Sequence, residues 1–324
     1  MPKAIVLHEY GRSDVLRLQA ITLKRPKAME IMVRQTAIGV HFHDIYVRTG
    51  LYKTLNLPGI PGLEAAGIVE AVGPGPSIFE TGDRVIYVTS EYGAYASHRI
   101  LPQKLAVKLP EAVSDAAAAT NFSRLLTVQM LMNNVTPLKP SQTILVTAAS
   151  GGVGRLLCQY AKAVGARVIG TVGSAAKGDT AKSYGCDYTF TYDQSDFFSS
   201  VNDITAGKGV DIVYDSVGAK TFDSSLSILA PLGHLVNFGQ SSGPVEPLAI
   251  SRLAEKSLTL TRPILFHYLA DHDAYHLMAK SALEALENGI FILPDLRCVP
   301  LRDAAFAHDQ MQLGQGGGSL YLSP

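Results

Sequence analysis

The sequence predicts an α/β protein in which a doubly wound parallel sheet accompanies a β-rich region. Three observations support this fold class. A glycine-rich turn at residues 148–154 lies between an apolar run and a stretch with helical spacing. From this turn to about residue 261, strand-like and helix-like segments alternate at the length of βαβ units. Residues 1 to roughly 120 instead contain short strands separated by glycine and proline.

The N-terminal region is predicted to be irregular β structure. After Pro110, Ser114 and Asp115 could cap a helix that runs through the alanines at 116–119 and continues to residue 133. The clearest strands of the region are expected at 31–40, 67–73 and 81–88, with turns such as Pro61-Gly62 between them.

The glycine-rich turn is the strongest indication of a ligand. It follows the apolar run 143–147 and opens a predicted helix at 155–161, so free backbone N–H groups and the helix dipole favour an anion there. Small residues let a pyrophosphate approach the backbone, which is typical of dinucleotide binding. The residues expected to contact the cofactor here are Ala148, Ser150, Gly151, Gly152 and Val153. Ala148 stands where the usual pattern has its first glycine, and a tight βα connection that binds nothing is the alternative.

Later strands of the same sheet are predicted at 167–172, 210–215 and 233–239. The segments after the last two, 216–218 and 238–241, should line the same crevice as the glycine turn, because parallel strands end at one edge. Toward the C-terminus, a helix is expected at 273–288, ended by Gly289, and the tail 320–322 is strand-like.

The end of the second strand favours NADPH over NADH. Sheets that bind NAD usually place a carboxylate there for the ribose hydroxyls, but here Val172 is followed by Gly173 and Ser174, with no acid before Asp179. Lys177 lies within a turn of Gly173 and could pair with a 2′-phosphate, to which the Tyr192 hydroxyl could also donate. The alternative is that Lys177 is an ordinary solvated lysine.

Length and composition exclude several classes of protein. A chain of 324 residues suits two domains, and 28 basic against 28 acidic residues argue against a nucleic-acid partner and for a small molecule. The three cysteines form no C-x-x-C pair, so neither a disulfide framework nor a cysteine zinc site is expected. With no signal pattern and no long uncharged apolar run, the sequence predicts a cytoplasmic protein without a membrane segment.

The whole chain resembles the zinc-independent quinone oxidoreductases of the medium-chain dehydrogenase/reductase superfamily, the zeta-crystallin-like group. The resemblance implies a Rossmann doubly wound parallel sheet inserted into a β-rich GroES-like catalytic domain, and a homodimer. The implied domains are 126–261 for NADPH and 1–125 with 262–324 for catalysis, with the active cleft between them. The segments that carry the resemblance are 62–67, 148–154 with Gln159 and Lys162, 214–218, 238–243 and 261–263.

The resemblance also implies which residues hold the cofactor. Gly173, Lys177 and Tyr192 match positions that hold the adenosine 2′-phosphate. The segments that contact the rest of the cofactor contain Thr127, Ser216, Phe238, Gly239, Ser241 and Arg262. The chain departs from the family in having His41 where Asn is common, and in having no Lys or Arg after Asp303.

A catalytic metal is not expected. The resemblance places two zinc ligands of the related alcohol dehydrogenases at His41 and Leu63, and leucine cannot coordinate. If the strand continues through this segment, His41 and His43 point to opposite faces. Tyr46 and Tyr52, with His41 close by, are the candidates for acceptor contact or proton donation. Plain packing of two tyrosines in a loop is the alternative.

These expectations together predict hydride transfer from NADPH to a quinone, in particular an ortho-quinone, without a metal. Such an acceptor needs little electrophilic help, so the protein mainly orients the two reactants. One alternative is reduction of an activated carbon–carbon double bond in an enone or alkenal. Another is a non-catalytic NADPH-binding protein, crystallin-like or RNA-associated, although the neutral charge balance weakens the RNA version.

Overall fold

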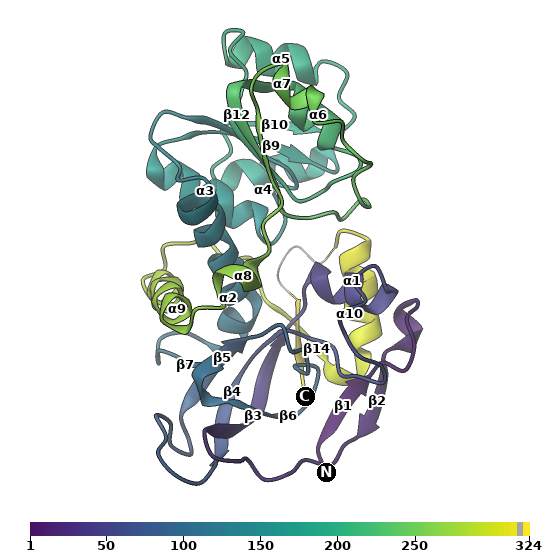
Figure 1. Ribbon diagram of the computed structural model, residues 1–324, viewed down its shortest axis with the longest axis vertical. Coiled ribbons are helices and arrows are strands. Elements are labelled where there is room, and N and C mark those ends of the chain that lie inside the picture. The colour runs from purple at the N-terminus through teal and green to yellow at the C-terminus, as the bar shows by residue number, and fades with distance from the viewer. Residues whose placement is uncertain (316–319) are drawn as a thin grey trace. The chain divides into compact units, whose positions relative to one another are not determined.

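The computed structural model describes residues 1–315 and 320–324, and it divides into two compact units. We call Thr127–His267 the middle unit, and Met1–Leu126 with Tyr268–Pro324 the split unit. Figure 1 shows the middle unit in teal and green, while purple and yellow segments from both chain ends build the split unit.

The middle unit contains one parallel sheet of six strands in the order β10-β9-β8-β11-β12-β13. Numbered from its first strand, this is the order 3-2-1-4-5-6 of a doubly wound dinucleotide-binding sheet. The predicted α/β class with a parallel sheet is confirmed. Its strands are β8 (Thr143–Val146), β9 (Arg167–Val172), β10 (Tyr188–Thr191), β11 (Val210–Asp215), β12 (Leu229–Asn237) and β13 (Thr259–Thr261).

Helices connect these strands and complete the core. In α3, which opens at Gly154, the buried residues include Leu156, Leu157 and Ala161, so one face packs on the sheet while the other stays polar. Gly165 ends this helix with a φ of 91°. The α-helices of the unit, apart from the shared α2 and α8, are α3 (Gly154–Val164), α4 (Gly178–Ser183), α5 (Phe197–Ile204), α6 (Phe222–Ser227) and α7 (Ser251–Ala254), with η3 (Met130–Val135) and η4 (Ala175–Lys177) as shorter or wider turns.

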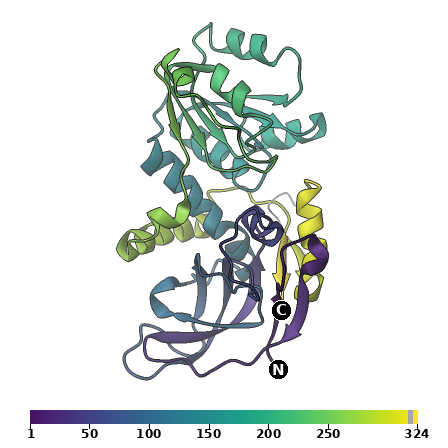
Figure 2. The ribbon, with the colours of Figure 1, turned by 45° about the vertical axis from the view of Figure 1, so that its right-hand side comes forward.

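The split unit is built on a seven-stranded, mainly antiparallel sheet. Its path is β14-β15-β3-β4-β5-β7, and β6 also pairs with β3. Strand β15 pairs with β3 at Tyr321↔Gly39, so the two chain ends share one sheet, and Figure 2 shows yellow and purple strands side by side. The strands are β3 (Glu30–Gly39), β4 (Glu64–Val72), β5 (Arg84–Val88), β6 (His98–Pro102), β7 (Ala106–Lys108), β14 (Arg297–Pro300) and β15 (Leu320–Ser323), besides the hairpin β1 (Lys3–Val6) and β2 (Arg17–Ala20).

Helices of four to sixteen residues accompany this sheet. The Ser114 hydroxyl accepts the Ala117 N–H at 3.2 Å, as the predicted cap requires, but the α-helix ends at Gln129 and continues to Val135 as a wider π-type turn. The helices are α1 (Phe42–Thr49), α2 (Asp115–Gln129), α8 (Leu265–Tyr268), α9 (His272–Glu287) and α10 (Ala304–Gln312), with η1 (Ser13–Val15), η2 (Gln103–Leu105) and η5 (Leu301–Asp303); α2 and α8 span the boundaries between units.

The strand assumed for His41 and His43 is wrong. His41 precedes α1 and His43 lies in its first turn, because the Asp44 carboxylate accepts the His41 N–H at 2.8 Å and starts a helix there. Gly50, with a φ of 79°, ends the helix one residue after Thr49.

Candidate active site

The glycine-rich turn is tightly closed. Ala148 has a φ of 50°, a left-handed conformation that usually requires glycine, so it takes the shape of the glycine it replaces. Its carbonyl accepts the Gly151 N–H at 2.8 Å. A Cβ on Gly154 would lie 2.2 Å from that same carbonyl oxygen, so only glycine fits at the start of α3. The turn therefore keeps a compact backbone, which a pyrophosphate can approach closely.

The predicted cofactor residues of the middle unit lie at one edge of its sheet. Because all six strands are parallel, the segments that follow them meet at their carboxyl ends. Those segments contain residues 148–153 after β8, Gly173 and Lys177 after β9, Tyr192 after β10, Ser216 after β11, Phe238, Gly239 and Ser241 after β12, and Arg262 after β13. Thr127 lies in α2 instead, and the roles of all these residues stay predictions.

Tyr192 is held against the glycine turn. Its hydroxyl oxygen accepts the Ala148 N–H at 3.0 Å, and burial raises the pKa of this phenol to about 12. The hydroxyl therefore keeps its proton at neutral pH and can donate it to an anion. A small cavity of about 20 Å³ adjoins it, lined among others by Thr147, Thr171 and Lys220.

Asp215 organises this edge, a role that sequence reasoning missed. Its buried carboxylate accepts the hydroxyls of Thr147 (2.9 Å) and Thr221 (2.7 Å), and the Asn237 amide (3.0 Å). The N–H groups of Val217 (3.0 Å) and Gly218 (3.3 Å) donate to it as well. One carboxylate thus fixes the ends of β8, β11 and β12 together. Sequence spacing does not reveal this role, because the two partners that tie Asp215 to other strands, Thr147 and Asn237, lie 68 and 22 positions away.

Arg262 is tied to the same edge from β13. Its guanidinium donates to the Asn237 carbonyl at 2.9 Å. The Phe238 N–H in turn donates to the Asp215 carbonyl at 2.8 Å, and the Ser241 N–H donates to the Ser216 carbonyl at 3.2 Å. The loops after β11 and β12 are therefore bonded to each other before any ligand arrives.

The split unit brings Tyr46 and Tyr52 together. Their rings meet edge to face with centroids 5.1 Å apart, and His43 packs on Tyr52 at 5.4 Å. Tyr92, which sequence reasoning also missed, stacks on His43 at 5.9 Å. Phe42 adds a further ring 6.1 Å from Tyr46. We call these five residues the aromatic cluster; such a set can hold a flat ring by stacking.

His41 lies beside this cluster but is paired with Glu64. Its Nε2 is 2.6 Å from Glu64 Oε2, and Glu64 is fully buried. The same carboxylate accepts the Ser123 N–H (2.8 Å) and hydroxyl (2.6 Å). A Cβ on Gly39 would lie 2.7 Å from His41 Nε2, so the close pair depends on glycine at that position. The ring is held in place by a residue of β4.

A buried polar network lies under α1. Burial raises the pKa of Asp44 to about 6, while burial, followed by the charge of Arg48, lowers that of His308 to about 3. The Tyr95 hydroxyl joins the two, at 3.2 Å from the Asp44 carboxylate and 2.9 Å from His308 Nε2. His308 is therefore neutral at pH 7, and the network holds α1 to α10.

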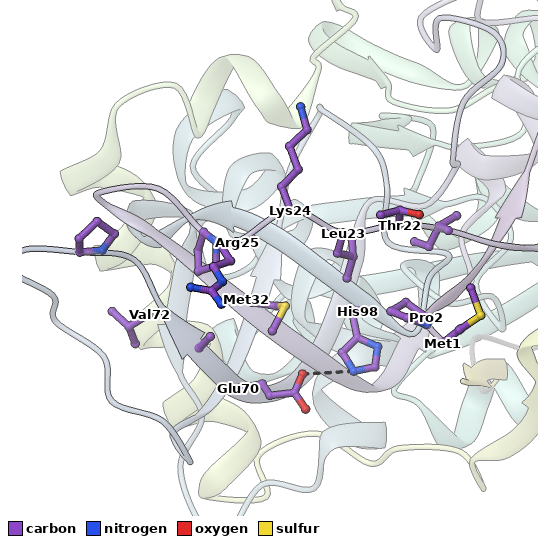
Figure 3. A pocket seen from close by; sticks show the side chains of 14 residues that line it. Met1, Pro2, Thr22, Leu23, Lys24, Arg25, Met32, Glu70, Val72 and His98 are labelled. Carbon is purple, nitrogen blue, oxygen red and sulfur yellow. Dashed lines mark ion pairs between the residues drawn. The ribbon is translucent and has the colours of Figure 1, made fainter.

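The described residues contain no group of three His, Cys, Asp or Glu side chains arranged to hold a metal ion. Leu63 is buried next to the His41 partner Glu64. A surface pocket of about 830 Å³ lies elsewhere on the split unit, between the segment 21–26 and strands β3 and β4 (Figure 3). It contains none of the predicted site residues, and a His98–Glu70 ion pair at 3.3 Å lines it.

Comparisons with known proteins identify the family of the chain. Residues 27–111 match the profile of the alcohol dehydrogenase GroES-like domain, and residues 152–282 match that of the zinc-binding dehydrogenases. The chain is 39% identical to quinone oxidoreductase 1 of Escherichia coli, with all of both chains covered. It is 36% identical to a 2-haloacrylate reductase of a Burkholderia species, covering 100% of this chain and 99% of that one.

Solved structures of quinone oxidoreductases are also similar to this chain. A crystal structure of Escherichia coli quinone oxidoreductase in complex with NADPH matches with a TM-score of 0.95 and 38% identity, over 99% of this chain and all of that one. Within the described part of the chain, none of the helices combines the length and the apolar character that crossing a membrane demands.

Proposed function

The chain belongs to the quinone oxidoreductase family of the medium-chain dehydrogenase/reductase superfamily, and we propose that it reduces ortho-quinones with NADPH and without a metal ion. The observation that carries the proposal is the edge of the middle-unit sheet, where the glycine-rich turn follows β8, and Gly173, Ser174 and Lys177 follow β9 in place of the acid of NAD-binding sheets. The aromatic cluster of the split unit supports a flat acceptor.

The cofactor site fits NADPH. The glycine-rich turn lies at the N-terminus of α3, where the helix dipole favours a pyrophosphate, and Lys177 and Tyr192 offer a cation and a hydroxyl for a 2′-phosphate. When bound, NADPH supplies a hydride to the acceptor. The chain's own residues orient the reactants: Asp215 fixes the loops after β8, β11 and β12, and Arg262 joins β13 to them.

The acceptor is assigned to the aromatic cluster. Tyr46 and Tyr52 present ring edges and hydroxyls to a flat quinone, and His41 is fixed by Glu64 beside them. Reduction to a hydroquinone needs no Lewis acid, because the developing charge is delocalised over an aromatic ring. Leu63 in place of a zinc ligand agrees with this chemistry.

The test is NADPH oxidation in the presence of 1,2-naphthoquinone, 9,10-phenanthrenequinone or a small enone, each with and without a chelator. We expect rapid oxidation with the quinones, unchanged by the chelator. Loss of activity that zinc restores would overturn the metal-free mechanism. Absence of turnover despite tight NADPH binding would overturn the enzymatic function and favour a crystallin-like binding protein.

Reduction of an activated double bond is the second candidate, since the similar 2-haloacrylate reductase is named for such a substrate. The same hydride would add to a carbon atom rather than to a quinone ring. Oxidation of NADPH with the enone or 2-chloroacrylate, and not with quinones, would move the function to this reaction.

A homodimer is proposed as well. Strand β13 is an open edge of the middle-unit sheet and is partly exposed, so two copies can pair there. Light scattering of the purified protein tests this: a mass of twice 34.6 kDa is expected.

A further inference from the structure

A continuous chain of hydrogen bonds joins Thr54 to two members of the aromatic cluster, Tyr92 and His43. The Thr54 hydroxyl is hydrogen-bonded to the Tyr92 hydroxyl, and the Tyr92 hydroxyl lies 3.0 Å from His43 Nε2. Thr54 is exposed, Tyr92 is only 5% exposed, and His43 is half-buried against Tyr52. The chain of hydrogen bonds thus leads from solvent to the rings that we assign to the acceptor.

Each group in this chain can both donate and accept a hydrogen bond. Burial raises the pKa of Tyr92, while burial and, after it, the charge of His41 lower the pKa of His43 to about 4. Both groups are therefore neutral at pH 7, and the chain can be polarised in either direction. His41 is the titratable group that acts on His43. The titratable groups that act on Tyr92 through their charge are Asp44, Tyr10 and Tyr52.

The backbone at Tyr92 is strained. Its φ of 53° is rare for a bulky side chain, and Gly93 follows with a φ of 100°. Such a conformation costs about 1–3 kcal/mol and persists where surrounding contacts fix it, often at functional sites. Here the contacts include the two hydrogen bonds of the Tyr92 hydroxyl.

We propose that Thr54, Tyr92 and His43 deliver the proton consumed in quinone reduction; this inference rests on the proposed function. A hydride carries two electrons and one proton to the quinone and leaves a hydroquinone monoanion. One further proton must come from water. It enters at Thr54, each O–H bond forms as the next one breaks, and His43 receives a proton at Nε2 and releases one from Nδ1 to the anion. The balance is quinone, NADPH and one proton giving hydroquinone and NADP⁺.

The decisive variant is Tyr92→Phe, which keeps the ring and removes the hydroxyl. Turnover is measured with a series of quinones whose hydroquinone monoanions differ in basicity. For the most basic anions we expect kcat to fall roughly 100-fold, the lower range of an acid–base contribution. For electron-poor quinones, whose anions leave without a proton, kcat should change little. Small external acids such as imidazolium should restore part of the lost rate.

Two further variants guard against a folding artefact. Thr54→Val should give a weaker defect with the same dependence on the acceptor, because water can replace the outermost link. Tyr275→Phe is the matched control: it also loses one tyrosine hydroxyl, bonded to the Leu105 carbonyl at 2.9 Å, but lies outside the relay. It should keep the wild-type rates with every quinone.

The outcomes separate the relay from the proposed function. If Tyr92→Phe slows all quinones by one factor, shows no rescue by external acid and keeps the wild-type solvent isotope effect, the relay is wrong and Tyr92 is structural. If none of the quinones supports NADPH oxidation by the wild-type protein, the proposed function is wrong, and the relay that rests on it is wrong as well.

Discussion

Lys177 is the residue expected to distinguish the two nicotinamide cofactors. It ends η4 just after β9, where its ammonium group can pair with a 2′-phosphate. Lys177→Ala should weaken NADPH binding by roughly 10- to 100-fold, since a hydrogen bond to a charged group contributes about 1.5–3 kcal/mol. NADH binding should be unchanged. Fluorescence titration with both cofactors measures this.

Lys182→Ala supplies the control for that variant. Lys182 lies in the next helix, α4, and is paired with Asp179 at 3.8 Å on the surface. Its removal should leave both affinities as in the wild type. Equal losses of NADPH and NADH binding in Lys177→Ala would show that Lys177 does not contact the phosphate.

His308 should make the protein sensitive to acid. Its folded-state pKa of about 3 lies below the ordinary value of 6.5, so its contribution to stability is complete above pH 6.5 and is lost as the pH falls toward 3. Between pH 7 and pH 4 this loss amounts to roughly 3 kcal/mol. From pH 7 to pH 4, the unfolding free energy of a His308→Gln variant should fall by roughly 3 kcal/mol less than that of the wild type. Urea titrations measure both values.

Asp44 acts in the opposite direction in the same network. Its pKa of about 6 lies above the ordinary 3.8, so its contribution is complete below pH 3.8 and is lost as the pH rises through 6. Because the two pH dependences partly offset each other in the wild type, the effect of His308 is obtained by comparing the unfolding free energies of the variant and the wild type at each pH. The exposed His8→Gln should follow the wild-type slope, and an unchanged slope in His308→Gln would contradict a neutral, buried His308.

Single residues show what the sequence could predict of the site. The turn at 148–154 was recognisable because its chemistry is local: strand, small residues and helix follow one another. Glu64 and Tyr92 gave no such signal, since the partners of Glu64, His41 and Ser123, lie 23 and 59 positions away, and Tyr92 lies 49 positions from His43. These groups become neighbours only when β4 and the loop after β5 pack beside α1.

At the scale of elements, the start of α3 carries a clear prediction. A Cβ on Gly154 would lie 2.2 Å from the Ala148 oxygen and 2.9 Å from its carbonyl carbon, both backbone atoms that cannot rotate away. Gly154→Ala should therefore displace the turn, weaken NADPH binding more than 10-fold and lower the unfolding free energy by more than about 1 kcal/mol. Calorimetric titration and thermal unfolding measure the two effects.

Gly165→Ala, at the other end of α3, separates helix stability from cofactor binding. Its Cβ would meet only Pro140 at 3.8 Å, but its φ of 91° strains any other residue. This variant should lose roughly 1 kcal/mol of stability and keep its affinity for NADPH. If both variants lose the cofactor equally, the turn is not its site.

Elements differ in how well periodicity predicts them. The strands that became β8, β9 and β11 were expected because buried parallel strands are continuous apolar runs. Strands β13 and β14 are as short as β8 or shorter, but most of their residues are not buried, so they lack the continuous apolar run that indicates a buried strand. Helix α1 was missed because its start depends on one hydrogen bond, from the His41 N–H to Asp44, rather than on apolar spacing.

At the scale of the whole molecule, NADPH should protect the two units unequally from hydrogen exchange. The residues that we propose for cofactor binding lie in the middle unit, so amides in 148–154 and 173–177 should exchange more slowly when NADPH is bound. At an NADPH concentration of 100 times Kd, binding stabilises the unit by about 2.7 kcal/mol, which slows exchange roughly 100-fold. The interior of β3, in the split unit, should exchange at its original rate. Equal protection of both would contradict the assignment of NADPH to the middle unit.

The pairing of β15 with β3 also has a consequence for synthesis. The ribosome makes β3 long before its neighbour β15, and α10 with His308 precedes β15 only slightly. The middle unit is synthesised before α10 and β15. Domains generally fold as units during translation. A growing chain should therefore complete the middle unit, to which we assign NADPH, while β3 still lacks its neighbour β15.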